Sequence, residues 1–234
     1  MPTALPPPPA DVVSAPVAVR RGRAARFAGW LALAGFGAIF GLVRARRSDA
    51  VDAAVTLKLQ QRDHPVLQSV MRAASWPGFP PQSRIIPAVI AGGLLVARLP
   101  LEAAFMFGAW GTALVASAVK VVMRRPRPVA GVDLRVVTAP LGGSSFPSGH
   151  TITYVGVYGY LAYLAHTLLR PVRWRRAIVA ALVGLVALVG PSRVHQGHHW
   201  FTDVTASYLL GLAYLIGLTG LYRRVKAARA GVRP

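Results

Sequence analysis

Three short polar clusters interrupt an otherwise apolar chain of 234 residues, at positions 120–128, 144–150 and 192–203. The first carries four Lys or Arg within eight residues, and the second ends in Ser-Gly-His directly before an apolar run. The third holds three His and one Asp. Cations and free backbone N–H groups bind anions, and a His with a carboxylate partner can act as a nucleophile. The clusters therefore point to chemistry on a phosphate.

The cations and the helix start supply the groups that would bind this phosphate. Arg127 and Arg193 each offer a bidentate fork, and Lys120 offers a point charge. A helix that starts at Ser148 and Gly149 presents free N–H groups and the positive end of its dipole, and Gly permits close approach. We expect these five residues to bind phosphate, although a basic membrane edge and an ordinary N-cap are the alternatives for each cluster alone.

The nucleophile must be His, Ser or water, because the chain has no cysteine. His199 and Asp203 are four residues apart and would share one face of a helix. Asp203 could accept from one ring nitrogen of His199, fix its tautomer and leave the other nitrogen free to attack. His150 could protonate the leaving oxygen and later activate water. The other acid that borders an apolar run, Glu102, is expected to be a solvated turn residue.

Together and in this order, the clusters resemble the three-part signature of the type 2 phosphatidic acid phosphatase (PAP2) superfamily. Residues 120–128 fit K-x6-R-P, residues 147–150 read P-S-G-H, and residues 192–203 fit S-R-x5-H-x3-D. The superfamily also includes vanadium haloperoxidases and glucose-6-phosphatase-like enzymes. No position of the three motifs departs from its pattern.

The resemblance implies hydrolysis through a phosphohistidine, without a metal or another cofactor. It makes His199 the nucleophile, Asp203 its orienter and His150 the acid. It also implies that phosphate is bound by the five residues Lys120, Arg127, Ser148, Gly149 and Arg193.

The composition is typical of a membrane protein. Lys and Arg number 27 and Asp and Glu 7, which gives a net charge of +20, yet 54% of the residues are hydrophobic. This hydrophobicity excludes a disordered chain. The absence of cysteine excludes disulfides, Cys-ligated metals and a Cys nucleophile. Basic loops beside anionic lipid explain the charge, so we expect a bilayer as partner and no nucleic acid. The resemblance adds a lipid phosphate as the substrate.

The apolar residues gather in six runs, which predict an all-α, polytopic integral membrane protein with six transmembrane helices. The resemblance implies that these helices form a PAP2-like bundle. A cleavable signal peptide is the alternative for the first run, and a buried helix of a soluble protein is the alternative for the fifth. The intervening segment 48–76 is too polar to span a bilayer and predicts one or two amphipathic helices at the interface, broken near Pro65. The six runs are 27–43, 85–97, 103–119, 151–169, 177–189 and 204–221.

These runs predict three regions: a disordered, Pro-rich and basic N-terminal tail (1–24), a six-helix membrane phosphatase domain (25–222) and a basic C-terminal tail (223–234). Each polar cluster lies in a loop that the chain reaches after an odd number of membrane crossings. All three clusters must therefore lie on one side of the membrane. The Lys and Arg of the loops divide almost equally between the two sides and do not set the orientation. The resemblance implies a cell-membrane protein with both termini cytoplasmic and the site on the extracytoplasmic side.

Several functions remain open at this point. The substrate could be undecaprenyl diphosphate, phosphatidic acid or phosphatidylglycerol phosphate, and segment 48–76 could be a lipid gate or platform. The phosphoryl group could instead pass to an acceptor other than water, or the site could hold vanadate for oxidation chemistry. A metal site at His195, His198 and His199 is a further alternative, as is a non-catalytic lipid-binding protein. The oligomeric state is not predicted.

Overall fold

A computed structural model describes residues 15–62, 64–129, 134–136 and 142–229, with the side chains of residues 15–21 excepted. Within these ranges the chain is helical and contains no strand. The helices are α1 (Ala15–Arg44), α2 (Asp49–Gln60), α3 (Pro65–Ser75), the 3-10 turn η1 (Trp76–Gly78), α4 (Gln82–Val96), α5 (Pro100–Trp110), α6 (Thr112–Met123), α7 (Gly149–Leu168), α8 (Val172–His195) and α9 (Phe201–Arg229).

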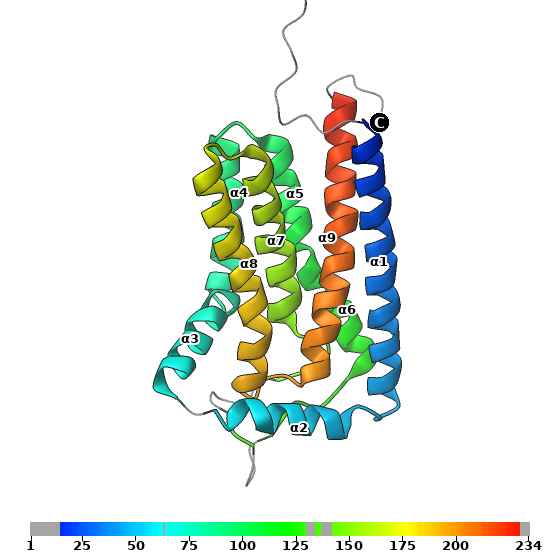
Figure 1. Ribbon diagram of the computed structural model, residues 1–234. Helices are drawn as coiled ribbons and strands as arrows, with labels where there is room; N and C mark the ends of the chain where they lie inside the picture. Colours follow the sequence, from blue (N-terminus) through cyan, green and yellow to red (C-terminus); the bar gives the residue numbers. More distant parts are fainter. Residues whose placement is uncertain (1–14, 63, 130–133, 137–141, 230–234) are drawn as a thin grey trace, which may run out of the picture.

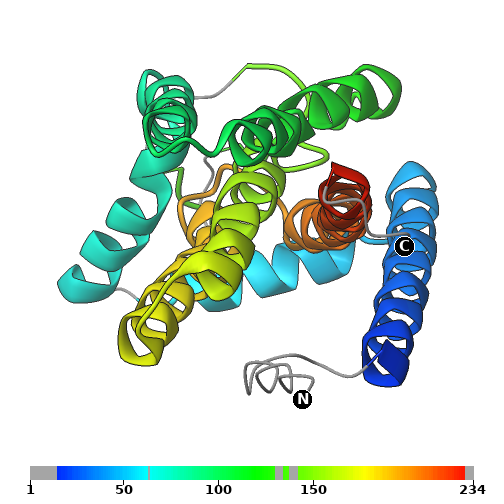
Figure 2. The ribbon, with the colours of Figure 1, turned by 90° about the horizontal axis from the view of Figure 1, so that it is seen from above.

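The long helices form an upright bundle, and α2 lies across one end of it (Figure 1). Helix α6 continues the direction of α5, and α1 runs beside α9 (Figures 1 and 2). The start of α1 and the end of α9 lie together at the end opposite α2. Helices α6 and α8 therefore end, and α7 and α9 begin, at the end that α2 covers.

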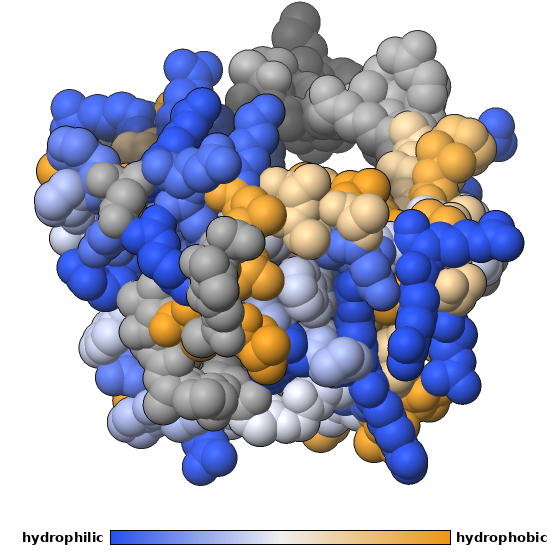
Figure 3. Space-filling view, turned by 90° about the horizontal axis from the view of Figure 1, so that it is seen from below, coloured by the Kyte–Doolittle hydropathy of each residue, from blue (hydrophilic) through white to orange (hydrophobic). Residues whose placement is uncertain are grey.

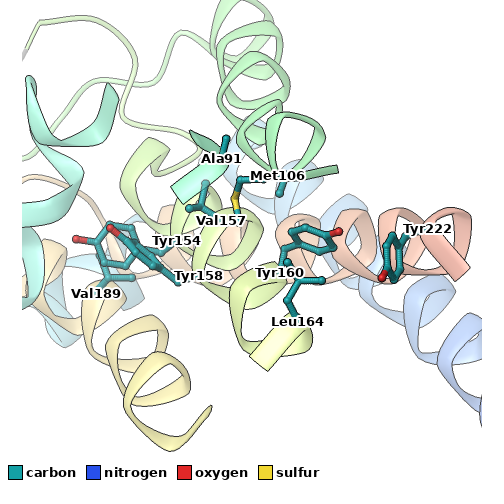
Figure 4. Packing of buried hydrophobic residues seen from close by; sticks show 10 residues of the cluster. Ala91, Met106, Tyr154, Val157, Tyr158, Tyr160, Leu164, Val189 and Tyr222 are labelled. Atoms are coloured by element: carbon teal, nitrogen blue, oxygen red, sulfur yellow. The ribbon is translucent and has the colours of Figure 1, made fainter. Parts of the chain in front are cut away.

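Helix α7 is the most enclosed helix of the bundle. Its buried side chains include Tyr154, Val157 and Tyr160, which pack with Met106 of α5 and Val189 of α8 (Figure 4). Close packing requires a small residue where α7 meets α5 and α6, because a side chain at position 156, a glycine, would overlap the backbone of the neighbouring helix. This tight core fixes the start of α7, on which His150 lies.

Among the described residues, four helical stretches are long and apolar enough to cross a membrane: Gly22–Arg44, Pro100–Met123, Val172–His195 and Phe201–Arg229. Their outer faces expose large apolar side chains such as Trp30, Leu114 and Val183, as lipid contact would require. The predicted spans 85–97 and 151–169 are helical, but α4 is short, and the four tyrosines and two threonines of α7 that precede its last turn reduce its apolar character. The structure thus supports an all-helical membrane protein, and the count of six spans stays a prediction.

The segment 48–76 forms two helices, as predicted, with a break before Pro65. His64 ends the break, because its Nδ1 accepts from the N–H of Val66 at 3.3 Å, and Pro65 opens α3. Helix α2 differs from the expected amphipathic pattern, since its buried residues, spaced four apart, are polar: Asp52, Thr56 and Gln60. This polar stripe faces the bundle, where the site lies.

Helices extend into both of the predicted tails. Helix α1 begins at Ala15, inside the predicted tail 1–24, and α9 continues to Arg229, past the predicted boundary at 222. Residues 1–14 and 230–234 lie outside the described residues.

Candidate active site

The three polar clusters meet at the end of the bundle that α2 covers. Lys120 lies in the last turn of α6, His150 in the first turn of α7, Arg193 in the last turn of α8 and Asp203 in the first turn of α9. His199 precedes α9 in the short connection from α8. Seen from this end the surface is largely hydrophilic, with apolar patches between the charged groups (Figure 3). The three clusters, which the sequence predicts on one side of the membrane, therefore lie at one end of the bundle.

His199 is held in one orientation by both of its ring nitrogens. The residue is 2% exposed, and its Nδ1 lies 2.7 Å from the carbonyl oxygen of Ser145. A carbonyl only accepts, so Nδ1 carries the proton and Nε2 carries the lone pair. Nη1 of Arg127 lies 3.2 Å from this Nε2 and can donate to it. The nitrogen that carries the lone pair is therefore Nε2, and its neighbour is the Arg127 cation.

Asp203 makes different contacts from those expected. Its Oδ2 is 3.7 Å from Nδ1 of His199, which is too far for a hydrogen bond. This Oδ2 accepts instead from the backbone N–H of Trp200 at 2.9 Å, and Oδ1 accepts from Arg125 at 2.7 Å. Asp203 is the third residue of α9, so its carboxylate closes the first turn in the manner of a capping box. The Ser145 carbonyl orients the His199 ring, and Asp203 acts on it only through space.

Two of the predicted phosphate-binding cations converge on one backbone oxygen. Nζ of Lys120 donates to the Ser144 carbonyl at 2.6 Å, and Nη2 of Arg127 donates to the same oxygen at 3.3 Å. Nη1 of Arg127 also donates to the His198 carbonyl at 2.7 Å. These carbonyls hold the two side chains beside His199 without neutralising them, so both charges remain available to an anion.

Arg193 is the largest completely buried side chain among the described residues. Its Nη1 donates to Ser75 Oγ at 3.1 Å and to Gln196 Oε1 at 3.2 Å, and its guanidinium lies 4.8 Å from the centre of the Phe79 ring. Its Nε and Nη2 are buried and have no hydrogen-bond partner in the part of the chain that the structure describes. Buried donors are nearly always paired, so these two mark a place for an anionic ligand.

His150 borders the same region from α7. Its ring packs edge-on against Phe79 with the centroids 4.6 Å apart, and a side chain at Gly78 would overlap it. Its buried Nε2 has no partner among the residues described. The turn that contains Gly78 and Phe79 thus fixes the ring and leaves this nitrogen available for a proton.

Ser148 is the N-cap of α7, since its Oγ accepts from the N–H of Thr151 at 3.4 Å and from the Thr151 hydroxyl at 3.0 Å. Gly149 follows as the first residue of the helix and lines the cavity described below. The hydroxyl of Ser148 is therefore engaged in the cap, and the free N–H groups of the first turn are what α7 offers to an anion.

Burial and nearby cations favour the neutral forms of His198 and His199. Burial lowers the pKa of His199 well below its ordinary value, and the charges of Arg193, Arg127 and Lys120 lower it further, whereas the Ser145 carbonyl opposes this effect. Burial first, and then the charges of Arg193 and Arg127, lower the pKa of His198 to about 3. A neutral His199 at physiological pH retains the lone pair that nucleophilic attack requires.

The alternative of a three-histidine metal site lacks the required geometry. Within the described ranges no three side chains of His, Asp or Glu converge on one point. Nε2 of His195 is buried and has no hydrogen-bond partner among the described residues. The backbone carbonyl of His195 accepts from Nε2 of Gln60 at 3.2 Å. His195 therefore lies beside the site rather than in a ligand set with His199.

Sequence reasoning missed four contributors to this site: Asp52, Ser75, Phe79 and Arg125. Arg125 binds Asp52 and Asp203, each at 2.7 Å. Its place inside the basic cluster was visible, but a run of cations does not show which of them faces a carboxylate. The one available signal for Asp52 was the polar spacing with Thr56 and Gln60.

A cavity of about 600 Å³ extends from the site between α4, α6 and α7. Lys120 and His150 line it at the site end, and apolar residues such as Phe107, Leu114 and Val157 line most of the remainder. A charged mouth with an apolar interior suits a ligand that carries a charged group on a hydrocarbon chain.

Comparison with known proteins agrees with this arrangement. The family model of the PAP2 superfamily matches residues 101–227. Phosphatidylglycerophosphatase B of Bacillus subtilis (strain 168) is 32% identical over 146 residues, which cover 60% of this chain and 68% of that protein.

Two solved structures share the fold. The first is the transmembrane PAP2-type phosphatidylglycerolphosphate phosphatase of Bacillus subtilis, with a TM-score of 0.75 and 23% identity, covering 85% of this chain and 98% of that one. The second is LpxE of Aquifex aeolicus, with a TM-score of 0.57 and 19% identity, covering 73% and 95%. At these identities both bear on the fold alone.

Proposed function

Because the chain belongs to the PAP2 superfamily, we propose that this membrane phosphatase hydrolyses a lipid phosphate through a phosphohistidine on His199. One observation carries the proposal. The ring of His199 is buried and its pKa is lowered, its Nδ1 donates to the Ser145 carbonyl, and its Nε2 faces Arg127. A histidine that only stabilised the fold would not need a lone pair beside a phosphate-binding cation.

In the first step, Nε2 of His199 attacks phosphorus and the bond to the lipid oxygen breaks. The leaving oxygen takes a proton from His150, which enters this step as the imidazolium, leaves it neutral and lines the cavity at its site end. The positive charge that develops on the His199 ring is stabilised by the Ser145 carbonyl at Nδ1 and by the carboxylate of Asp203 at 3.7 Å. In the second step His150 takes a proton from water, the water oxygen attacks phosphorus, and the bond to Nε2 breaks.

The cations lower the barrier of both steps. Negative charge spreads over the equatorial oxygens of the transferring group, and donors already in place stabilise it at little reorganisation cost. The unpaired Nε and Nη2 of Arg193, together with Lys120, Arg127 and the first N–H groups of α7, are the donors for these oxygens. No step requires a metal ion.

We further propose phosphatidylglycerol phosphate as the preferred substrate. Two observations support this choice: the apolar cavity that opens at Lys120 and His150, and the similarity to a phosphatidylglycerophosphatase. We also propose the orientation that the family resemblance implies, with the start of α1 and the end of α9 in the cytoplasm and the site on the extracytoplasmic side.

Phosphate release from the purified full chain in detergent, with EDTA present, tests the proposal. The panel is phosphatidylglycerol phosphate, phosphatidic acid and undecaprenyl diphosphate. His199→Ala is the test variant, and His166→Ala, which changes an exposed histidine at the far end of α7, is its matched control. We expect release with EDTA from the wild type and the control, fastest from phosphatidylglycerol phosphate, and none from His199→Ala.

The outcomes separate the alternatives. Activity retained by His199→Ala would contradict the assignment of the nucleophile, and a faster second lipid would replace the proposed substrate. Loss of the lipid phosphate without free phosphate would indicate transfer to another acceptor. A folded protein that acts on no lipid of the panel would overturn the lipid phosphatase proposal.

A further inference from the structure

Helix α2 covers the site with a buried polar face. Asp52 and Thr56 are completely buried and Gln60 is 3% exposed, although the helix lies at the end of the bundle (Figure 1). A surface helix ordinarily buries its apolar face. On α2 the apolar Val51 is instead 54% exposed. Burying a carboxylate is costly unless it is paired. The contacts of Asp52 therefore show why α2 buries its polar face.

Asp52 caps the helix that follows the nucleophile. Its Oδ1 accepts from the backbone N–H of Thr202 at 2.8 Å, and its Oδ2 accepts from the Thr202 hydroxyl at 2.8 Å. Thr202 is the second residue of α9, so this N–H has no acceptor within the helix. A carboxylate at a helix start is also favoured by the helix dipole. Helix α2 thus holds the start of α9, one turn from His199.

Arg125 connects this cap to the groups that face His199. Its Nη2 donates to Asp52 Oδ2 at 2.7 Å, and its Nη1 donates to Asp203 Oδ1 at 2.7 Å and to Thr202 Oγ1 at 2.8 Å. Its backbone is equally engaged, since its N–H donates to Ser144 Oγ at 3.0 Å and its carbonyl accepts from the N–H of Ser145 at 2.8 Å. One residue therefore places both the Ser145 carbonyl and the Asp203 carboxylate beside Nδ1 of His199.

We infer that Asp52 and Arg125 are positioning residues for the nucleophile, with Asp52 acting through Arg125 and through the start of α9. Asp203 and Ser145 are the groups through which they reach the His199 ring. Removing the charge of Asp52 leaves the guanidinium of Arg125 with a single buried carboxylate and loosens the turn that carries His199. The inference rests on the proposed function, because it assigns the role of these residues in that reaction.

Asp49 is a matched control on the same helix. Its Oδ1 lies 3.5 Å from the same Nη2 of Arg125, but its side chain is 61% exposed. An exposed ion pair contributes little because water screens it, whereas the buried contact at 2.7 Å fixes geometry. Asp49→Asn and Asp52→Asn therefore make the same chemical change on one helix, but only Asp52→Asn should lower kcat.

The test is the steady-state kinetics of full-length Asp52→Asn and Asp49→Asn in detergent, on the best lipid of the panel. Asn at position 52 can still accept from Thr202 but no longer carries the charge that holds Arg125. We expect kcat of Asp52→Asn to fall about 100-fold, the effect of a nucleophile displaced by about 1 Å. KM and the inhibition constant of inorganic phosphate should stay within about twofold, because the phosphate-binding cations are untouched. Asp49→Asn should match the wild type.

Thr202→Val keeps the test valid if Asp52→Asn does not fold. It removes the hydroxyl that donates to Asp52 and accepts from Arg125, while the ion pair between Asp52 and Arg125 remains, and we expect kcat to fall about tenfold with KM unchanged. Equal kcat in the wild type and in whichever of Asp52→Asn or Thr202→Val folds would overturn the inference, as would parallel losses of kcat and phosphate affinity. An inactive wild type, or an active His199→Ala, would instead refute the proposed function.

Discussion

The two ends of the bundle both bury charged side chains, but they pair them to different degrees. At the end away from the site, Glu102 is 3% exposed, and its Oε1 accepts from the hydroxyl of Tyr222 and from Nζ of Lys226, each at 2.7 Å. At the site end, Arg193 is completely buried and keeps two nitrogens without a partner among the described residues. The hydrogen bonds of the first group are complete, whereas the second group keeps two donors that an anion could bind.

This difference separates a structural role from a functional one. The Glu102 contacts join the start of α5 to the end of α9, and a satisfied buried pair of this kind specifies how helices dock. Arg193, Arg127 and Lys120 instead hold positive charge close together, which opposes folding and favours an anion. A count of buried charges would not distinguish the ends, but their pairing does.

Arg193→Met, compared with a substitution at the other end, should show the largest difference in activity between the two ends. Met fills a similar volume against Phe79 but cannot bind phosphate oxygens, so kcat/KM should fall about 10³-fold, as when an oxyanion donor is removed. Thermal stability should hold or rise, because an incompletely paired buried charge is lost. Lys226→Met at the other end should leave kcat/KM within about twofold, because it lies far from the reacting groups. A Lys226 variant as impaired as Arg193→Met would erase the distinction between the ends.

Acidification should weaken the site end selectively. The pKa of His198, about 3 in the folded protein, is below the unfolded value of about 6.5, so the unfolded state binds more protons in that window. The contribution of His198 to stability is therefore full above about pH 6.5 and falls by about 1.4 kcal/mol per pH unit below it. Thermal unfolding between about pH 7 and about pH 4.5 checks this, since the window lies between the two pKa values of His198. The slope should become shallower by about this amount in His198→Asn, where His199 still contributes, and should be unchanged in His166→Ala. An unchanged slope in both variants would contradict the assigned cause.

Phe79→Leu should have an intermediate effect on catalysis. The ring lies under the Arg193 guanidinium and against the His150 ring, and contacts of this kind are worth about 1 kcal/mol. We expect kcat/KM to fall about tenfold, measured by phosphate release, while Leu maintains the packing. Full activity in Phe79→Leu would show that the turn after α3 does not position either group.

Glu102→Gln should have the smallest effect, and only on stability. Lys226 is half exposed and can be solvated once the charge opposite it is gone, so the loss should be about 1 kcal/mol, or a few degrees in Tm. Phosphate release should be unchanged. A drop in kcat comparable to that of a site variant would mean that the two ends are coupled.

The segments that form the site could be predicted from sequence, but the hydrogen bonds and ion pairs between them could not. The apolar runs located the helices, and the order of the clusters placed Lys120, His150 and His199 at one end. The acceptor for His199 is a backbone carbonyl, which leaves no mark on residue identity. Asp203 was expected to bind the ring directly, yet its place at the start of α9 gives it a capping role.

Two acids were misjudged for the same physical reason. Glu102 was expected to be solvated and Asp52 to lie on an interfacial helix, but both are buried against partners far away along the chain. Pairing between distant segments depends on the packing of the bundle. Local hydropathy describes the residue and its neighbours, and it cannot show which remote cation removes the cost of burial.

The central claim is tested most directly by trapping the phosphoenzyme. Wild-type protein is mixed with phosphatidylglycerol phosphate in detergent with EDTA, quenched in alkali within a single turnover, and digested for mass spectrometry. We predict a phosphate on His199, absent from His199→Ala and formed more slowly by Asp52→Asn. Phosphate on another residue, or turnover by the wild type with no phosphohistidine at any quench time, would contradict the account.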